Sequence, residues 1–315
     1  MSNRVVTFTL NPAYDLLGYC PNIELGDVNL VNTNDFLPAG KGINVAKVLC
    51  DLDHQVTVGG FLGEDNCEAF NHLFDKLGIE NKFQTVTGST RINVKLTDQN
   101  GEVTDLNFSG FSINEGQWAN FVKSSLDFIK NTDIVVISGS LPTGINLEDF
   151  TDWIKQVKSI CSKVIFDSSR NALIAGLKAK PWLIKPNDKE LEMLVGYPLT
   201  SINEIKQAAM DLVNQGINNV IVSLGSKGAL WVTKDEYWIA TPPKCQVVST
   251  VGAGDTMVAG IVHGLLSNFS IQQTLIFASA VSALSVSQAG VGISDMAKLN
   301  SMLEQINIIA GKEKK

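Results

Sequence analysis

A glycine-rich turn with a single carboxylate lies in the segment VSTVGAGDTMVAG, residues 248–260. The turn, Gly252-Ala253-Gly254-Asp255, separates β-branched residues from an apolar run typical of a helix. The first N–H groups of a helix lack intrahelical partners and lie at the positive end of its dipole, so they bind anions. Asp255 could therefore accept a proton from a hydroxyl that attacks a bound phosphate. An ordinary strand-to-helix junction with an acidic first turn is the alternative interpretation.

A second glycine-rich helix start occurs in LPAGKGINVAKVL, residues 37–49. Gly40, Lys41 and Gly42 precede the helical pattern, and Asn44 falls in its first turn. The chain has no GxxxxGK[ST] match, which disfavours a P-loop NTPase. The backbone and Asn44 could hold a polyhydroxylated ligand, or Lys41 could simply be a solvated cation.

Two oxygen-bearing side chains follow an apolar strand in KPNDKELEML, residues 185–194. Asn187 and Glu190 are three residues apart at a helix start, so both can face one point. Amide and carboxylate oxygens suit Mg²⁺, which keeps most of its waters and is usually held together with substrate phosphates. A solvated acidic turn is the alternative. The loop SLGSKG, residues 223–228, could also hold phosphates through its backbone amides.

Cationic and polar side chains alternate in RINVKLT, residues 91–97. Strand periodicity places Arg91, Asn93 and Lys95 on one face. Beside a cleft, such cations could anchor a phosphate that the substrate already carries. Solvated cations on a surface strand are the alternative.

The elements that must position these residues are short apolar strands that alternate with amphipathic helices. Strands are predicted at 4–10, 55–61, 133–138, 163–168, 182–185 and 218–224. Helices are predicted at 42–52, 66–78 and 202–216, among others. Continuously apolar strands separated by helices indicate a doubly wound, mostly parallel sheet with helices on both faces. In such α/β folds the active site lies outside the carboxyl ends of the strands.

Two segments interrupt this alternation. Residues 14–36 have the polar turns of short strands, and residues 91–110 alternate with period two around an Asn-Gly pair, which is a strong hairpin signal. Together they predict a small β-sheet that acts as a lid or a dimerisation surface. We therefore expect one α/β domain, residues 1–315, with a β-lid inserted in two pieces.

Composition narrows the class of protein. With 315 residues, 44% of them hydrophobic, the chain can bury a large core. Its net charge of −7 and pI near 5.1 argue against non-specific binding to nucleic acid or to an anionic membrane. We see neither a secretory signal nor an apolar run of membrane-spanning length.

The cysteines and histidines show no metal-ligand spacing. The five cysteines are scattered and odd in number, which predicts reduced thiols in a cytoplasmic protein. His54, His72 and His263 are expected to be structural or solvated.

In combination, the motifs are similar to those of the PfkB/ribokinase-like sugar kinases. TLNPAYD, AGKGINVAKVL, GGFLG, TRINVKL, SGSLP, KPNxxE, SLGxxG and STVGAGD occur in that family's order and spacing, over roughly residues 4 to 300. The resemblance implies a ribokinase-like fold with a lid at about 12–37 and 88–112. It also implies ATP-dependent phosphorylation of a sugar. The wording TLNPAYDL, TRINVKLT, NFSGF and GALWV is most similar to members that phosphorylate D-fructose 1-phosphate at O6, giving fructose 1,6-bisphosphate and ADP.

The resemblance also implies roles for the matching residues. Asp255 would be the catalytic base, and Gly252, Ala253 and Gly254 would form the anion hole with it. The sugar site would contain Asp15, Gly40, Lys41, Asn44, Arg91, Asn93 and Ser138, with Arg91 on the sugar's phosphate. Nucleotide contacts would come from Lys185, Asn187, Ser223, Gly225, Ser226, Gly228 and Gly254. Asn187 and Glu190 would position Mg²⁺ largely through water, and Ser249 and Val251 would contribute carbonyls to a K⁺ site.

Further expectations follow from the family and from the helix start. Members commonly dimerise through the lid, so a homodimer is expected. A positive helix N-terminus is expected to lower the pKa of Asp255 and keep it ionised at neutral pH.

Alternative functions remain at this point. A kinase for tagatose 6-phosphate or fructose 6-phosphate would have the same fold, and Arg91 and Lys95 disfavour a neutral sugar. An inactive sugar-phosphate sensor is the non-enzyme alternative. A nicotinamide-binding enzyme would require GxGxxG after the first strand, where this chain has NPAYD.

Overall fold

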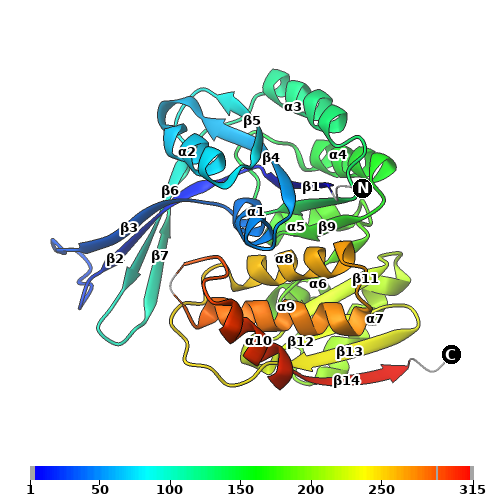
Figure 1. Cartoon of the computed structure of the whole chain (residues 1–315). Helices are drawn as coiled ribbons and strands as arrows, with labels where there is room; N and C mark the ends of the chain where they lie inside the picture. The colour runs from blue at the N-terminus through cyan, green and yellow to red at the C-terminus, as the bar shows by residue number, and fades with distance from the viewer. Residues whose placement is uncertain (1–3, 289, 313–315) are drawn as a thin grey trace.

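The structure, a computed structural model, describes residues 4–288 and 290–312 (Figure 1). The main feature of these described residues is a sheet of ten strands. In spatial order they are β14 (Asn307–Lys312), β13 (Glu236–Thr241), β12 (Ala229–Val232), β11 (Asn219–Ser223), β10 (Leu183–Ile184), β9 (Val164–Asp167), β8 (Ile134–Ser138), β1 (Arg4–Thr9), β4 (Gln55–Gly63) and β5 (Glu80–Val86).

Neighbouring strands from β5 to β11 are parallel. The predicted α/β class with a mostly parallel sheet is therefore confirmed. The pairs from β11 to β14 are antiparallel. This antiparallel edge was not predicted. It arises because the short turn Gly225–Lys227, a 3-10 helix (η2), returns the chain directly beside β11 instead of through a crossover helix.

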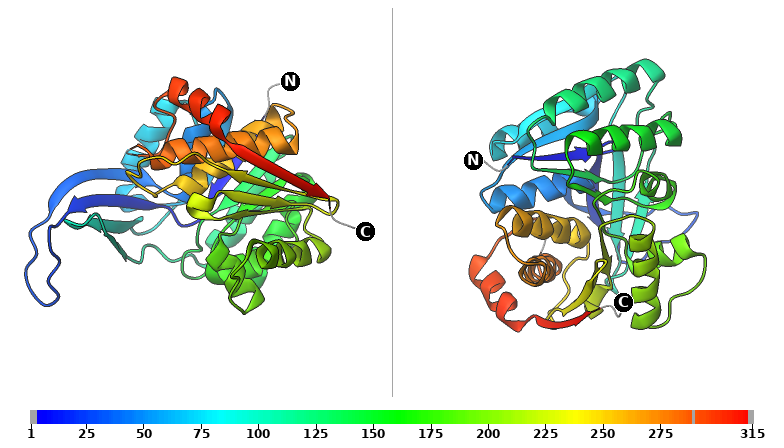
Figure 2. Two further views of the ribbon diagram at one scale, coloured as in Figure 1. Left: turned by 90° about the horizontal axis from the view of Figure 1, so that it is seen from below. Right: turned by 90° about the vertical axis from the view of Figure 1, so that its right-hand side faces the viewer.

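Helices cover both faces of the sheet (Figure 2). One face packs against α1 (Lys41–Asp51), α2 (Glu68–Leu77), α8 (Ala253–Leu266), α9 (Ile271–Val286) and α10 (Met296–Gln305). The other packs against α3 (Glu115–Phe128), α4 (Leu147–Ile160), α5 (Arg170–Leu177), α6 (Asp188–Val195) and α7 (Ile202–Asn214). A strand such as β8 is apolar at every position because Ile134 packs on the first face and Val135 on the second.

Helix α8 is buried on almost all sides because it lies between α1 and α9. Small residues allow its close approach to α9. A Cβ on Gly260 would lie 2.6 Å from Cα of Ala278, and one on Gly264 would lie 2.6 Å from Oγ1 of Thr274. This packing fixes the position of the N-terminus of α8, where the GAGD turn lies.

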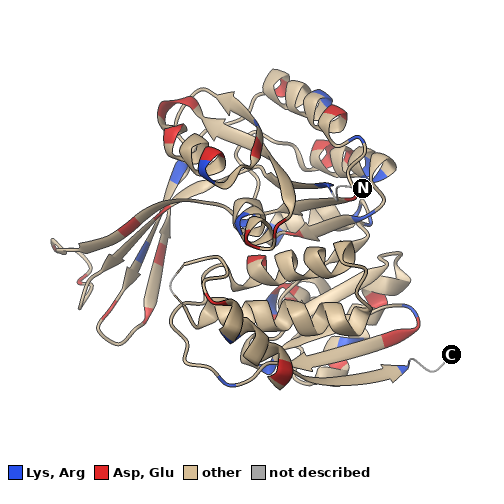
Figure 3. Ribbon diagram, in the orientation of Figure 1, with Lys and Arg blue, Asp and Glu red and all other residues tan. Residues whose placement is uncertain are grey.

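A second sheet of four strands projects from the body (Figure 1). Its order is β3 (Asn32–Ala39), β2 (Ala13–Tyr19), β6 (Arg91–Thr97) and β7 (Val103–Asn107). Strand β2 pairs in parallel with β6, and β6 and β7 form the hairpin that the sequence predicts. Positions of Lys and Arg alternate along the ribbon with positions of Asp and Glu over the whole molecule (Figure 3). No helix in the described ranges is long and apolar enough to cross a membrane.

Candidate active site

A cavity of about 560 Å³ lies where the carboxyl ends of the central strands meet the four-stranded sheet. Its walls come from segments that are far apart in the sequence. Predicted site residues that line it are Asp15, Gly40, Lys41, Asn44, Arg91, Asn93, Val251, Gly252, Gly254 and Asp255. Ser138 is not one of them. It ends β8, is 3% exposed, and the next two residues, Gly139 and Ser140, line the cavity instead.

Asp255 lies in the first turn of α8 and is 5% exposed. Its Oδ2 accepts a 2.8 Å hydrogen bond from Nδ2 of Asn44, in the first turn of α1. Gly252 precedes the helix with φ of 77°, and a Cβ there would lie 2.3 Å from Cγ2 of Val291. Glycine is therefore required at this turn for both backbone and space.

The pKa of Asp255 is raised to about 6 rather than lowered as the sequence suggested. Burial is the largest cause. The charges of Lys41 and Lys185 and the hydrogen bond from Asn44 lower the pKa of Asp255, whereas the nearby carboxylate of Asp167 raises it further. The expectation of a lowered pKa was wrong because the loss of hydration by a buried carboxylate outweighs the attraction of a helix start, which contributes only about 0.3–1 kcal/mol.

Asp167, which sequence reasoning missed, lies beneath the cavity between two lysines. It ends β9, is 1% exposed, and contacts Nζ of Lys41 at 3.2 Å and Nζ of Lys185 at 3.5 Å. Burial alone would raise the pKa of Asp167, but the two ammonium groups hold it below its usual value. A single acidic residue at the end of an apolar strand, as in VIFDS, was the available signal.

Lys185 connects this ion cluster to the GAGD turn. Its side chain is buried, and a Cβ on Gly254 would lie 3.2 Å from its Nζ. Burial would lower the pKa of Lys41, but Asp167, Asp255 and Glu190 together raise it above its ordinary value. Lys185 therefore lies next to the start of α8, and Lys41 lies within the field of the Asp255 carboxylate.

On the four-stranded sheet, Asp15 is held by two neighbours. Lys95 pairs with its Oδ2 at 2.6 Å, and Nδ2 of Asn93 donates to its Oδ1 at 3.2 Å. Arg91 lies two residues before Asn93, on the same face of β6. It donates from Nη2 to the carbonyl of Asn11 at 3.3 Å. Its buried Nε has no hydrogen-bond partner among the described residues, so this guanidinium retains an unused donor beside the cavity.

Asn187 and Glu190 cap α6 reciprocally instead of simply facing one point. Asn187 Oδ1 accepts from the backbone N–H of Glu190 at 2.7 Å, and Glu190 Oε2 accepts from that of Asn187 at 2.9 Å. The second carboxylate oxygen of Glu190 is left for a ligand. No group of three or more acidic, histidine or cysteine side chains suited to a metal occurs in the described parts of the chain. A metal at Asn187 and Glu190 would therefore need water and phosphate to complete its shell.

The residues predicted to contact nucleotide gather at the ends of β10 and β11. Asn187 forms a parallel bridge with Ser223, whose N–H donates to the carbonyl of Pro186 at 3.0 Å. Gly225 and Ser226 form the 3-10 turn η2 that follows. Gly228 closes it with φ of 100°, and a Cβ there would lie 1.8 Å from the carbonyl oxygen of Ala240.

The loop before α8 is held by α9. The N–H groups of Val248 and Ser249 donate to the carbonyl of Val286 at 2.8 and 3.3 Å, and Oγ of Ser249 accepts from Val251 N–H at 3.2 Å. Ser249 is therefore fixed against the C-terminal end of α9, and Val251 is fixed against Ser249, directly before the GAGD turn.

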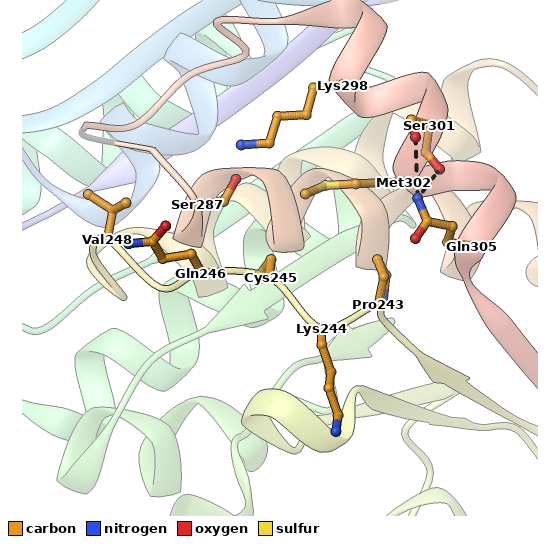
Figure 4. Close-up of a pocket in the computed structure, with 10 residues that line it drawn as sticks. All are labelled: Pro243, Lys244, Cys245, Gln246, Val248, Ser287, Lys298, Ser301, Met302 and Gln305. Atoms are coloured by element: carbon orange, nitrogen blue, oxygen red, sulfur yellow. Dashed lines mark hydrogen bonds between the residues drawn. The ribbon is translucent and has the colours of Figure 1, made fainter.

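A second cavity, of about 360 Å³, lies between residues 243–248 and α10 (Figure 4). The side chain of Lys298 points towards Ser287, whereas Lys244 points away from the other labelled residues (Figure 4). Its lining within the described residues contains no carboxylate. A carboxylate able to accept a proton beside the amides of a helix start occurs instead in the cavity of about 560 Å³, which is the candidate active site.

Comparison with known proteins agrees with this assignment. The model of the pfkB family carbohydrate kinases matches residues 4–298. The chain is 56% identical to the 1-phosphofructokinase of Escherichia coli strain K12 over 308 residues, which covers 98% of this chain and 99% of that protein.

Solved structures give the same result. Phosphofructokinase-2 from Escherichia coli in complex with potassium superposes with a TM-score of 0.89 at 30% identity, covering 96% of this chain and 99% of that one. The tetrameric inhibited form of the same enzyme gives 0.88 at 30% identity, with the same coverage. The predicted ribokinase-like fold with its small additional sheet is confirmed.

Proposed function

The chain belongs to the pfkB family of carbohydrate kinases, and on that premise we propose that it transfers the γ-phosphoryl group of ATP to O6 of D-fructose 1-phosphate. The products are fructose 1,6-bisphosphate and ADP. The observation that carries the chemistry is the buried carboxylate of Asp255 among the amides at the start of α8, inside the main cavity. The substrate follows from the full-length identity to 1-phosphofructokinase.

In the proposed mechanism Asp255 accepts the proton of the sugar's O6–H. A bond forms between O6 and Pγ while the bond from Pγ to the β,γ-bridging oxygen breaks, and its electron pair remains on ADP. The amides of Gly254 and Asp255, with the ammonium of Lys185, stabilise the negative charge on the transferred group. With a pKa of about 6, Asp255 is largely ionised at neutral pH and yet basic enough to take the proton.

Asn44 and the ion cluster position these groups. The hydrogen bond from Asn44 engages Oδ2 of Asp255 and leaves Oδ1 for the substrate. Asp167 holds Lys41 and Lys185 at fixed places. Gly40 places backbone close to the sugar and Asn44 places its side-chain amide there. The carboxylate of Asp15 accepts hydrogen bonds from the sugar's hydroxyls.

The phosphate already on the sugar is bound by Arg91. Lys95 is neutralised by Asp15, whereas Arg91 contacts only a carbonyl and keeps a free Nε–H. Asn93 holds Asp15 in place from the adjacent strand. A guanidinium that lacks an acidic hydrogen-bond partner suits a phosphate dianion.

The residues present fit the cations that such kinases use. Mg²⁺ would be held by Asn187 and Glu190 through water, and when bound it neutralises charge on the nucleotide phosphates. The nucleotide phosphates themselves lie against Lys185, Ser223, Gly225, Ser226 and Gly228. Backbone carbonyls of Ser249 and Val251 suit K⁺, in keeping with the potassium complex of phosphofructokinase-2.

The four-stranded sheet serves as a lid, inserted into a single domain as about residues 12–37 and 88–112, and as the surface of a homodimer. Apolar side chains are unusually exposed in the loop between β2 and β3, where Leu25 is 98% exposed and Val28 and Leu30 are each 86% exposed. Phe36 in β3 and Phe108, directly after β7, are about half exposed. Such patches on a soluble protein mark contact surfaces. The free cysteines agree with a protein of the cytoplasm.

The test is ADP release with Mg-ATP and four acceptors: fructose 1-phosphate, fructose 6-phosphate, tagatose 6-phosphate and fructose. We expect kcat/KM for fructose 1-phosphate to exceed the others by roughly 100-fold or more, since a site built to pair with a phosphate at one position discriminates against a sugar that has no phosphate there. Preference for a sugar 6-phosphate would instead indicate a fructose-6-phosphate or tagatose-6-phosphate kinase. No ADP release with any of them would favour the sensor function.

A further inference from the structure

Arg170, which the sequence motifs did not single out, lines the active-site cavity together with Gly252, Gly254 and Asp255. It is the first residue of α5, three positions after Asp167. Its φ of 52° lies in the left-handed region. A long side chain is uncommon there, and such strained positions persist where the surrounding structure enforces them, often at functional sites.

The other cations of the cavity are already engaged. Lys41 pairs with Asp167 and Lys95 pairs with Asp15. Arg91 donates to a carbonyl. The exposed guanidinium of Arg170, in contrast, has no hydrogen-bond or ion-pair partner in the described portion of the chain. Its whole guanidinium is therefore available to a ligand, in addition to the unused Nε–H of Arg91 in the same cavity.

Rigid elements hold Arg170 on the side of the anion hole. Ser168 donates from Oγ to the carbonyl of Gly139 at 2.6 Å, and Gly139 N–H donates to the carbonyl of Asp167 at 3.0 Å. These bonds join the ends of β8 and β9 directly before α5. Arg91 instead lies on the four-stranded sheet. The two guanidinium groups thus come from different walls of one cavity, as a ligand with a phosphate at each end would require.

We propose that Arg170 binds the phosphoryl group during its transfer, as the counterpart of Arg91 on the phosphate that the sugar already carries. This inference rests on the proposed function. As the O6–Pγ bond forms and the bond from Pγ to ADP breaks, the guanidinium donates to the equatorial oxygens of the moving group. Asp255 takes the proton of O6, and Arg170 exchanges no proton.

The decisive variant is Arg170→Gly, because glycine adopts the left-handed backbone without strain. The fold should be retained or stabilised while the side chain is lost. Lys180→Gly is the matched control, since Lys180 is another exposed cation with φ of 50° and does not line this cavity. Arg170→Lys tests whether the fork of donors matters beyond charge.

Calorimetric binding separates this inference from the proposed function. For Arg170→Gly we expect the Kd of fructose 1,6-bisphosphate to rise roughly 10- to 100-fold, in line with the loss of charge-assisted hydrogen bonds. The Kd of fructose 1-phosphate should stay within about twofold, and Lys180→Gly should match the wild type for both ligands. Equal weakening of both ligands, or of neither, overturns the role of Arg170. If the wild type binds neither sugar, the proposed function fails and this inference fails with it.

Steady-state kinetics provide the second measurement. For Arg170→Gly, kcat should fall roughly 10²–10³-fold with little change in KM for the sugar phosphate. Guanidinium chloride at millimolar concentration should restore part of the lost kcat in this variant, and it should have no such effect on Lys180→Gly. Unchanged kcat, or a loss that tracks a lowered Tm, contradicts the role.

Discussion

The amide of Asn44 donates a 2.8 Å hydrogen bond to the carboxylate of Asp255, and each residue occupies the first turn of its helix. The bond joins α1 to α8 across 211 positions of sequence. It engages one carboxylate oxygen and stabilises the ionised form of a buried acid, whose pKa is nevertheless raised to about 6. The pH dependence of catalysis should therefore report this contact.

Loss of the Asn44 amide should shift the acidic limb of the pH–activity profile to higher pH. In the wild type, kcat/KM should fall as pH drops through about 6, where Asp255 takes up a proton and can no longer act as a base. In Asn44→Ala the hydrogen bond that lowers this pKa is gone, so the limb should lie at higher pH. A pH–rate profile of both proteins checks this, and superimposable acid limbs would contradict it.

Asp255→Asn should separate activity from stability. We expect kcat to fall roughly 10²–10⁴-fold, the usual contribution of a general base. The pKa of Asp255 is about 6 in the folded protein and 3.8 in the unfolded chain, so ionisation of this carboxyl disfavours the folded state. The stability that the protonated carboxyl contributes is therefore lost as pH rises from 3.8 through about 6. The variant should therefore match the wild type in Tm near pH 4 and exceed it by about 2–5 °C at pH 8. A lower Tm at pH 8 would contradict this account.

Asp167→Asn should destabilise strongly, because it leaves Lys41 and Lys185 without their buried counter-charge. Removal of one partner from a buried ion pair costs about 3–5 kcal/mol, so Tm should drop by about 6 °C or more. Asp127→Asn is the control, since Asp127 and Lys130 form an exposed pair and are 75% and 64% accessible. Differential scanning calorimetry should show no shift for that control, and equal shifts for both variants would refute the role of Asp167.

The contact between His54 and His263 should make the fold sensitive to acid. Their ring nitrogens are 2.8 Å apart, and His263 stacks on Phe277. Burial, with His54 nearby, lowers the pKa of His263 to about 4 from 6.5. In this pH range His263 binds a proton more readily in the unfolded chain than in the folded protein. The free energy of unfolding should therefore decline as pH falls from about 6.5 to about 4. Urea unfolding of the wild type and His263→Leu over this range should show a shallower pH slope in the variant.

Arg91→Ala should act on substrate binding. Because Arg91 lies remote from O6 in the proposed complex, KM for fructose 1-phosphate should rise roughly 10- to 100-fold with a small change in kcat. KM for ATP should stay unchanged, which serves as the internal control. An unaltered KM for the sugar phosphate would remove Arg91 as its anchor.

Local patterns were sufficient to predict the central strands and the helix starts. The apolar segments at 4–10 and 133–138 are β1 and β8, and the GAGD turn begins α8 as expected. Such features depend on neighbouring residues, which a sequence shows directly. The same holds for Asn100 and Gly101 in the β6–β7 hairpin.

Contacts between distant segments could not be read in this way. Asp167 meets Lys41 and Lys185 only because β9 lies between β8 and β10, and His54 meets His263 only after α8 packs on α1. The pKa of Asp255 was mispredicted for the same reason, since its burial depends on segments more than 200 positions away. Strand β14 was missed because four of its six residues are exposed at the sheet edge.

Strand β1 lies between β4 and β8, with Val5 opposite both Val56 and Ile134. It precedes both of these neighbours in the chain, and one of its edges pairs with residues that are made about 130 positions later. Helix α8 arrives later still and brings Asp255 to Asn44. A nascent chain stalled before α8 would expose the apolar faces of α1 and the sheet, the kind of surface that chaperones bind. A product that ends before α8 would therefore lack both the Asp255 carboxylate and its contact with Asn44.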